Sequence, residues 1–348
     1  MAHLSCAGKE TQMKKTIVFL LSAILLLGGC TGKPSETGPG AVIPTDAPVA
    51  SLSADAFYTR YKESSSRPVA VMVDNDNGQA RPHAGLTEAY MIYEVPVEGG
   101  ATRLMALFYP EGKEKIGPVR SSRHYFLDYV LEHDALYTHF GYSPRALADI
   151  PALGINNLNG VEGSGADIFW REDEATRAYH SAFTSMEKIL NKTGVLGYRT
   201  EREKSPLVFA EQVTELAEGK DATSVKIPYT GFYSSGFSYD AESGNYKKLI
   251  GESAHPIQED GELRAKNIII MQMKTYPLGD GSARINIDTV GTGKGQYITM
   301  GKSIPITWEK TSRSAKTVWK NEKGEEIKLN PGTTWVMLLP SGVSPQIG

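Results

Sequence analysis

PVAVMVDN (68–75) is the first of three apolar runs that decide the fold, and it is followed by YMIYEVPV (90–97) and RLMALFY (103–109). Runs of this length without polar alternation are typical of strands that are buried on both faces of a sheet. The second and third runs are separated only by the glycine-containing segment 98–102, so we expect them to pair as a hairpin.

Helical patterns follow these strands. In SSRHYFLDYVLEHD (121–134) the apolar residues recur at helical spacing, and Ser121 or Ser122 can cap the first turn. The continuation predicts one more strand and two helices, namely ALYTHFG (135–141), SPRALADI (143–150) and a helix after the capping-box sequence Thr184-Ser185-Met186-Glu187. Strands interleaved with helices predict an α/β layered domain with a mixed sheet.

The pattern changes in the C-terminal part of the chain. Short apolar or alternating runs recur there about every 8–12 residues, as in GFSYD and YKKLI around Ser243-Gly244-Asn245. This spacing predicts a mostly antiparallel β sandwich or barrel-like domain. We therefore expect an α+β two-domain chain, with the α/β domain at 55–220 and the all-β domain at 221–348.

An export signal precedes the folded part. IVFLLSAILLLGG (17–29) is a short apolar run after Met13-Lys14-Lys15, which is typical of a secretory signal and too short to span a bilayer. It ends in Leu27-Gly28-Gly29-Cys30, which has the form of a lipobox cut by lipoprotein signal peptidase. We predict that residues 1–29 are removed and that the Cys30 thiol carries diacylglycerol with palmitate-type acyl chains; the alternative is an ordinary signal peptide with an incidental cysteine.

Two further features fit export. The first twelve residues follow no signal pattern, so we expect Met13 to be the true start. Residues 30–54 are rich in Pro, Gly, Ser, Thr and Ala, which predicts a flexible tether behind the lipidated cysteine. We therefore predict a protein that is lipid-anchored to the cell membrane on its extracytoplasmic face.

Charge and cysteine content exclude several classes of function. The net charge is −3, which provides no general attraction to nucleic acid. The two cysteines are Cys6, which lies in the removed segment, and Cys30, so no disulfide, cysteine metal site or thiol catalyst is expected in the mature chain. We expect no cofactor.

Several stretches of the folded part are characteristic of a known family, namely RPVAVMVDN (67–75), EVPVEGGATR (94–103), IGPVRSSRHYF (116–126), THFGYSP (138–144), FWREDEATRAYH (169–180), FSYDAESGNYKK (237–248), VGTGKGQYITMGKSIPITW (290–308) and PGTTWVMLLP (331–340). With them the folded part resembles the YerB-like lipoprotein family, which is catalogued as a domain of unknown function (3048) with N- and C-terminal parts. The resemblance covers nearly all of 55–340. It implies an envelope lipoprotein with an α/β part and a β part, and it supplies no reaction.

Charged residues gather in the motifs of the first domain. Because polar residues at strand ends of an α/β sheet tend to meet at one edge, they are candidates for a site. The candidate ligand-binding residues are Arg103, Arg120, Arg123, Arg171 and Arg177, and the candidate catalytic residues are Asp74, Glu94, Glu98, His139 and His180.

The segment GPVRSSR (117–123) is the most interpretable of these motifs. If it opens a helix, free N–H groups and two arginines would together hold a phosphate or carboxylate. Alternatively, the arginines pair with Asp74, Glu94 and Glu98 in a structural network, since unpaired buried charges are costly. Both interpretations remain open from the sequence.

Other motifs give weaker signals. His139 and His180 with Glu94 or Glu98 could form a metal site or an acid–base pair, but no HExxH-like spacing is present, so we expect no metal and favour hydrogen-bonded histidines. GTGKG (291–295) lacks phosphate-loop spacing and predicts a hairpin turn. The aromatic residues of the β domain are interpreted as core, with a sugar-stacking platform as the alternative; they are Trp308, Trp319, Trp335, Tyr233 and Tyr239.

Two hypotheses of function follow. The first is a non-enzymatic cell-envelope binding or accessory module that recognises an anionic wall polymer or an envelope protein. The second is a hydrolase that acts on wall polymers through carboxylate and histidine acid–base chemistry. Convergence of His139, His180, Glu98 and an arginine in one open cleft would favour the second hypothesis.

Overall fold

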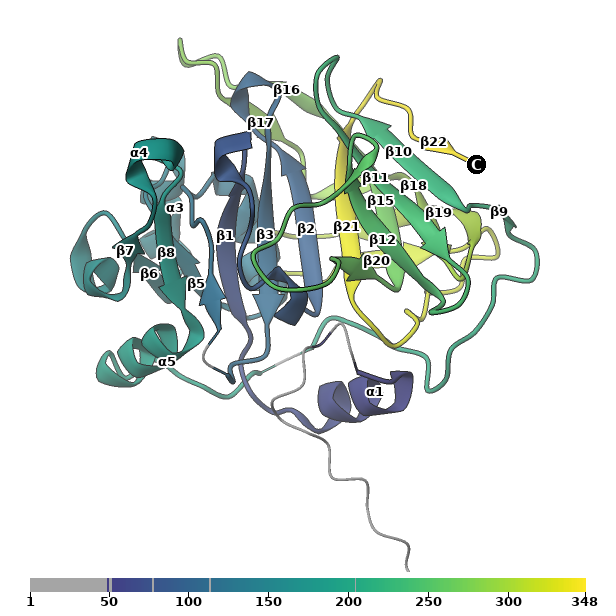
Figure 1. The fold of residues 1–348 in the computed structure, drawn as a ribbon, viewed down its shortest axis with the longest axis horizontal. Coiled ribbons are helices and arrows are strands. Elements are labelled where there is room, and N and C mark those ends of the chain that lie inside the picture. Colours follow the sequence, from purple (N-terminus) through teal and green to yellow (C-terminus); the bar gives the residue numbers. More distant parts are fainter. Residues whose placement is uncertain (1–48, 50–51, 77, 113, 204) are drawn as a thin grey trace, which may run out of the picture. The chain divides into compact units, whose positions relative to one another are not determined.

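A mixed sheet of eleven strands forms the centre of the fold in the computed structural model, which describes residue 49 and residues 52–76, 78–112, 114–203 and 205–348 (Figure 1). The predicted signal peptide and Cys30 lie outside these residues. From one edge to the other the strands are β20 (Val318–Lys320), β19 (Lys302–Lys310), β18 (Gly291–Thr299), β15 (Asn267–Met273), β21 (Thr334–Pro340), β2 (Met91–Pro96), β3 (Thr102–Phe108), β1 (Val69–Asn75), β5 (Leu136–His139) and β6 (Asn157–Asn159), with β9 (Lys220–Asp221) beside β19.

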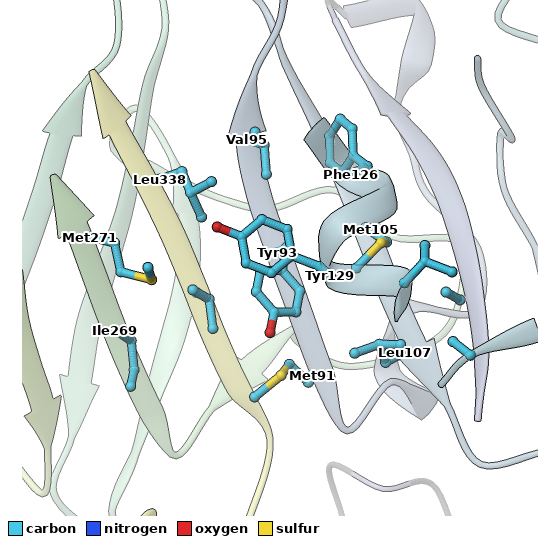
Figure 2. Close-up of a cluster of buried hydrophobic side chains, with 14 of the residues drawn as sticks. Met91, Tyr93, Val95, Met105, Leu107, Phe126, Tyr129, Ile269, Met271 and Leu338 are labelled. Atoms are coloured by element: carbon cyan, nitrogen blue, oxygen red, sulfur yellow. The ribbon is translucent and has the colours of Figure 1, made fainter. Parts of the chain in front are cut away.

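The three apolar runs form β1, β2 and β3, and each is buried along its whole length. The predicted hairpin is confirmed, because β2 and β3 pair antiparallel with Met91 opposite Leu107. Alternate residues of β1 enter different cores, with Met72 in one and Val71 and Val73 in the other. Figure 2 shows the first core, in which Tyr93 and Met105 pack beside the helix that carries Tyr129.

Short helices cover the β1–β6 part of the long sheet (Figure 1). The α-helices are α1 (Ala54–Glu63), α2 (Leu127–Glu132), α3 (Pro144–Ala152), α4 (Glu174–Arg177) and α5 (Met186–Val195). The 3₁₀ turns are η2 (Gly78–Ala80), η3 (Leu86–Glu88), η4 (Glu98–Gly100), η5 (His124–Phe126) and η6 (Gly163–Ile168). The predicted helices at 143–150 and after Thr184 are present as α3 and α5, and the hydroxyl oxygen that caps α5 is that of Ser185, which accepts from Lys188 N.

A second, mostly antiparallel sheet packs on the C-terminal half of the long sheet. Its strands are β13 (Ser253–Ala254), β12 (Asn245–Ile250), β11 (Ser234–Asp240), β10 (Ser224–Pro228) and β22 (Gln346–Ile347), with β14 (Arg264–Ala265) beside β12. Phe237 of this sheet contacts Trp335 of the long sheet edge to face, with ring centroids 5.8 Å apart. The predicted fold class, an α/β layered part followed by an antiparallel sandwich, is thereby confirmed.

Two smaller sheets complete the set of described strands. One pairs β16 (Thr275–Pro277) with β17 (Ile285–Ile287), and the other has the order β4 (Lys115–Ile116), β8 (Ala182–Ser185) and β7 (Trp170–Arg171). The long sheet itself runs across the predicted boundary at 220/221, because β21 pairs in parallel with both β2 and β15. The division of the chain at that boundary stays a prediction.

The glycine-rich segment GTGKG is not a turn, as the sequence suggested, but the first half of β18. Its glycines are needed for close packing. A Cβ on Gly293 would lie within van der Waals overlap of the Trp308 indole, 2.4 Å from Nε1, and one on Gly295 would lie 2.1 Å from the carbonyl oxygen of Ile270. Glycine therefore marks a close approach of neighbours here.

The aromatic residues of the β part belong to the core. Trp308, Trp319, Trp335 and Tyr233 are all buried, and Tyr239 packs against the same core with partial exposure. Their burial leaves no open stacking platform at these positions, so the interpretation as core holds for the described structure.

Candidate functional site

Asp74, His180 and Arg120 meet at the end of β1. His180 Nδ1 donates to Asp74 Oδ2 over 2.6 Å, and Arg120 Nε lies 3.1 Å from the same oxygen. Both Asp74 and His180 are fully buried, whereas the Arg120 side chain is 22% exposed. Burial by itself would raise the pKa of Asp74, but the hydrogen bond from His180 and the charges of Arg120 and Arg103 lower it, so Asp74 is an anion.

Glu98, Arg123 and Arg103 continue this group across the β2–β3 turn. Glu98 forms an ion pair with Arg123, and Arg123 Nε donates to its Oε2 over 3.0 Å. Arg103 Nη2 lies 3.9 Å from Glu98, and its Nη1 donates to the carbonyl of Ser121 over 2.7 Å. Burial opposes ionisation of Glu98, but the hydrogen bond and charge of Arg123 and the charge of Arg103 outweigh it and lower the pKa of Glu98 to about 2.

We call Asp74, Glu98, Arg103, Arg120, Arg123 and His180 the arginine cluster. It brings together six of the ten candidate residues. Its charges are largely paired, as the structural-network interpretation expects. The exception is the outer part of Arg120, whose guanidinium makes no hydrogen bond to any described residue although its Nε is buried beside Asp74.

The segment 117–123 is extended and ends at Arg123, which takes the N-cap position of η5 without a side-chain capping hydrogen bond; η5 continues into α2, so the helix predicted at 121–134 begins at His124. The backbone of this segment is held as an extended strap, because Val119 N donates to Ala182 O and Arg120 N to Met72 O. Ser122 is fully buried and accepts from the Tyr137 hydroxyl, so it is not a cap. Arg120 is thus positioned by β-type backbone contacts on a rigid support, whereas Arg123 stands at the start of η5.

The loop between β7 and β8 lies over this strap. Tyr179 from this loop contacts the ring of His180 with centroids 4.1 Å apart, and Arg120 Cζ lies 4.6 Å from the centre of the Tyr179 ring. Tyr179 itself is 56% exposed. The loop is attached by Arg177, which donates to the carbonyl of Pro82 over 3.1 Å. Tyr179 therefore covers part of the Arg120 guanidinium and of the His180 ring.

Glu94 belongs to a different, fully buried network. Its carboxylate accepts from Tyr233 (2.6 Å), Ser235 (2.8 Å) and Trp335 Nε1 (3.1 Å), and Lys248 Nζ lies 3.7 Å away. Burial lowers the pKa of Lys248 to about 8, while the charge of Glu94 acts in the opposite direction. Lys248 was not foreseen from the sequence, because the pair Lys247-Lys248 does not show which of the two lysines faces the core.

Two histidines that the sequence did not single out lie between these groups. His83 Nε2 donates to the carbonyl of Asp74 over 2.6 Å, and its Nδ1 lies 2.7 Å from His255 Nε2. Burial lowers the pKa of His83 to about 3 and that of His255 well below its ordinary value, so both rings are neutral. Nothing in the spacing of two isolated histidines predicts this pair.

The remaining candidates lie apart from the arginine cluster. His139 Nδ1 donates to Gly141 O over 2.8 Å, and burial lowers its pKa to about 4. Arg171 donates to the Ser181 hydroxyl over 2.9 Å. Arg177 lines a polar hollow of about 580 Å³ together with Arg81, Lys115 and Glu172. His139 does not join His180 and Glu98, so the full acid–base set does not converge in one cleft.

Two features are absent from the described residues. No group of three or more His, Cys, Asp or Glu side chains is arranged to hold a metal ion. No helix among the described residues is long and apolar enough to cross a membrane.

Comparisons with known proteins match both parts of the chain. Residues 58–199 match the N-terminal domain, and residues 225–336 the C-terminal domain, of a protein of unknown function, DUF3048. The chain is 28% identical over 335 residues to the protein named "Putative lipoprotein YerB" of Bacillus subtilis (strain 168), covering 94% of this chain and 96% of that protein. It is also similar to the crystal structure of the YerB protein from Bacillus subtilis, with a TM-score of 0.72 and 28% identity over 86% of this chain and 99% of that one.

Proposed function

Because the chain belongs to the DUF3048 family, whose function is unknown, we propose a function from its own residues: a lipid-anchored, extracytoplasmic module that binds an anionic group of the cell envelope through Arg120. The anionic group would be carried by a wall polymer or by an envelope protein. The signal sequence ending at Cys30 and the lipoprotein name of the similar Bacillus protein support the anchoring.

One observation carries the binding proposal. The Arg120 guanidinium is held in place by Asp74 on one side and by the Tyr179 ring on the other, yet it makes no hydrogen bond to a described residue. A guanidinium has five N–H donors in a planar fork that matches a phosphate or carboxylate. A positioned arginine with unused donors loses little conformational freedom when an anion binds.

The charged side chains around Arg120 leave an excess of positive charge in the arginine cluster. Three arginines face two carboxylates in the cluster, and His180 adds a polar ring. Burial and, next to it, the charge of Arg123 lower the pKa of Arg103 to about 10, which shows how closely the cations are packed. An anion beside Arg120 would relieve that repulsion.

The Arg120→Ala variant is expected to bind insoluble cell-wall material about ten- to a hundredfold more weakly than the unaltered protein, because a charge-assisted hydrogen bond contributes about 1.5–3 kcal/mol. Co-sedimentation with purified walls would measure this. Arg284→Ala removes an arginine that pairs with Asp280 on the β16–β17 hairpin, and it should bind normally. Equal binding by Arg120→Ala and Arg284→Ala would contradict the proposal.

One observation favours the hydrolase as a second candidate. In the Asp74–His180 pair a buried carboxylate orients an imidazole whose other nitrogen is unbonded, as a general base requires. We expect the full-length protein to release no soluble fragments from purified walls if it only binds. The hydrolase would be established instead if the unaltered protein and the His139→Asn variant released fragments and the His180→Asn variant did not.

A further inference from the structure

His180 has a polar atom without a partner inside the protein. Its side chain is completely buried, and Nε2 makes no hydrogen bond to any described residue. Buried polar atoms in native proteins are nearly always hydrogen-bonded, because an unpaired one has lost its water without gaining a partner. The other ring nitrogen, Nδ1, is bonded to Asp74. Nε2 is therefore a place where a ligand atom would be stabilised.

This atom belongs to a ring beside Arg120. Asp74 Oδ2 contacts both His180 Nδ1 and Arg120 Nε, and the Tyr179 ring lies against both the imidazole and the guanidinium. A ligand that replaced the Tyr179 ring would thus meet the two side chains together. Both of them have unused hydrogen-bonding capacity.

His180 and Arg120 offer a ligand different hydrogen-bonding groups. Asp74 is ionised and can only accept, so Nδ1 of His180 carries the proton that lies between them. In the neutral imidazole Nε2 then has a lone pair and accepts a hydrogen bond. Arg120, in contrast, can only donate. The two side chains therefore complement an anionic group and a hydroxyl group that are close together.

We propose that the ligand is a hydroxylated anion, such as a polyol phosphate unit: its anionic group binds Arg120, and a neighbouring hydroxyl donates to His180 Nε2 after Tyr179 is displaced. This inference rests on the proposed function, because it specifies the ligand of the same site. The loop that carries Tyr179 has a strained joint, since Ala178 has a φ of 49° and a ψ of −125°, a conformation that favours glycine. Its other end, Asp173, is also left-handed with a φ of 52°.

The test compares glycerol 3-phosphate with n-propyl phosphate, which has the same anionic group and no hydroxyl. Calorimetry on the full-length protein in detergent at pH 8.5, where free imidazole is neutral, should show about fivefold tighter binding of glycerol 3-phosphate. His180→Asn, whose amide can still donate to Asp74, should bind n-propyl phosphate within about twofold and lose the preference. His139→Asn, in a buried histidine outside the cluster, should retain the preference.

The outcomes separate the two proposals. If the unaltered protein binds both phosphates equally, the hydroxyl contact is overturned and the binding proposal stays intact. The same holds if the preference for glycerol 3-phosphate persists in His180→Asn. Both proposals are overturned if neither phosphate binds and neither glycerate nor propionate binds. An arm with glycerate and propionate, a matched carboxylate pair, tells whether the anionic group is phosphate or carboxylate. Tyr179→Ala should bind glycerol 3-phosphate at least as tightly as the unaltered protein; weaker binding would show that Tyr179 is part of the site and would overturn its displacement.

Discussion

Glu94→Leu is expected to lower the free energy of unfolding by about 3–5 kcal/mol, which is the cost of leaving one member of a buried ion pair without its partner. Lys248 would remain fully buried, with only Ser235 Oγ and the carbonyl of Leu249 as hydrogen-bond acceptors. The hydrogen-bond donors of Tyr233 and Trp335 would also lose their acceptor. Denaturant unfolding measures the change.

The reverse change should cost less. In Lys248→Met the Glu94 carboxylate keeps the hydrogen bonds from Tyr233, Ser235 and Trp335, so its charge remains solvated by the protein. Lys226→Met is the matched control, because Lys226 pairs with Glu252 on the surface, and it should change the stability by less than about 1 kcal/mol. A Glu94→Leu variant as stable as the control, or less harmed than Lys248→Met, would contradict this account of the network.

Cys30→Ala is expected to abolish acylation completely. In cells fed labelled palmitate the unaltered chain should take up label. The variant should take up none and should keep its signal sequence up to Gly29, because lipid attachment precedes the cut at a lipobox. Cys6→Ala provides the control, since the sequence has only these two cysteines. Its label should be unchanged. Label on the Cys30→Ala chain, or loss of label in Cys6→Ala, would show that the anchor has been assigned to the wrong residue.

The strands that are buried on both faces could be predicted because their runs are continuous. PVAVMVDN, YMIYEVPV and RLMALFY contain few polar residues, and the structure places them in β1, β2 and β3. The register between distant segments could not be predicted. The parallel pairing of β21 with β2 joins residues more than two hundred positions apart, and it depends on packing that no local pattern records.

Local signals failed where glycine or serine serves packing. GTGKG has the composition of a turn, but Gly293 and Gly295 are there because Trp308 and the Ile270 carbonyl come too close for a side chain. Ser122 is of a residue type that often caps helices, but its hydroxyl accepts a hydrogen bond from the Tyr137 hydroxyl inside the core. Turn and cap preferences are statistical, and tertiary contacts override them.

Part of the candidate site could be predicted from the sequence, and the reason is physical. Asp74, Glu98 and Arg103 lie at strand ends of one hairpin sheet, and strand ends share an edge. The roles of Lys248 and of the His83–His255 pair could not be inferred, because the sequence does not show which face of a short strand or loop is buried. The unbonded Nε2 of His180 is likewise visible only in three dimensions.

The central claim is that Arg120 is the side chain that meets an anionic ligand. The side-chain Nε–Hε resonances of the full-length protein in detergent micelles, assigned with the Arg120→Ala variant and followed during titration with glycerol 3-phosphate, test it most directly. We predict a saturable shift of the Arg120 resonance, and none of the resonance of Arg284, which lies on the β16–β17 hairpin. A resonance of Arg120 that stays unchanged, or that shifts only in proportion to all other arginines, would contradict the account.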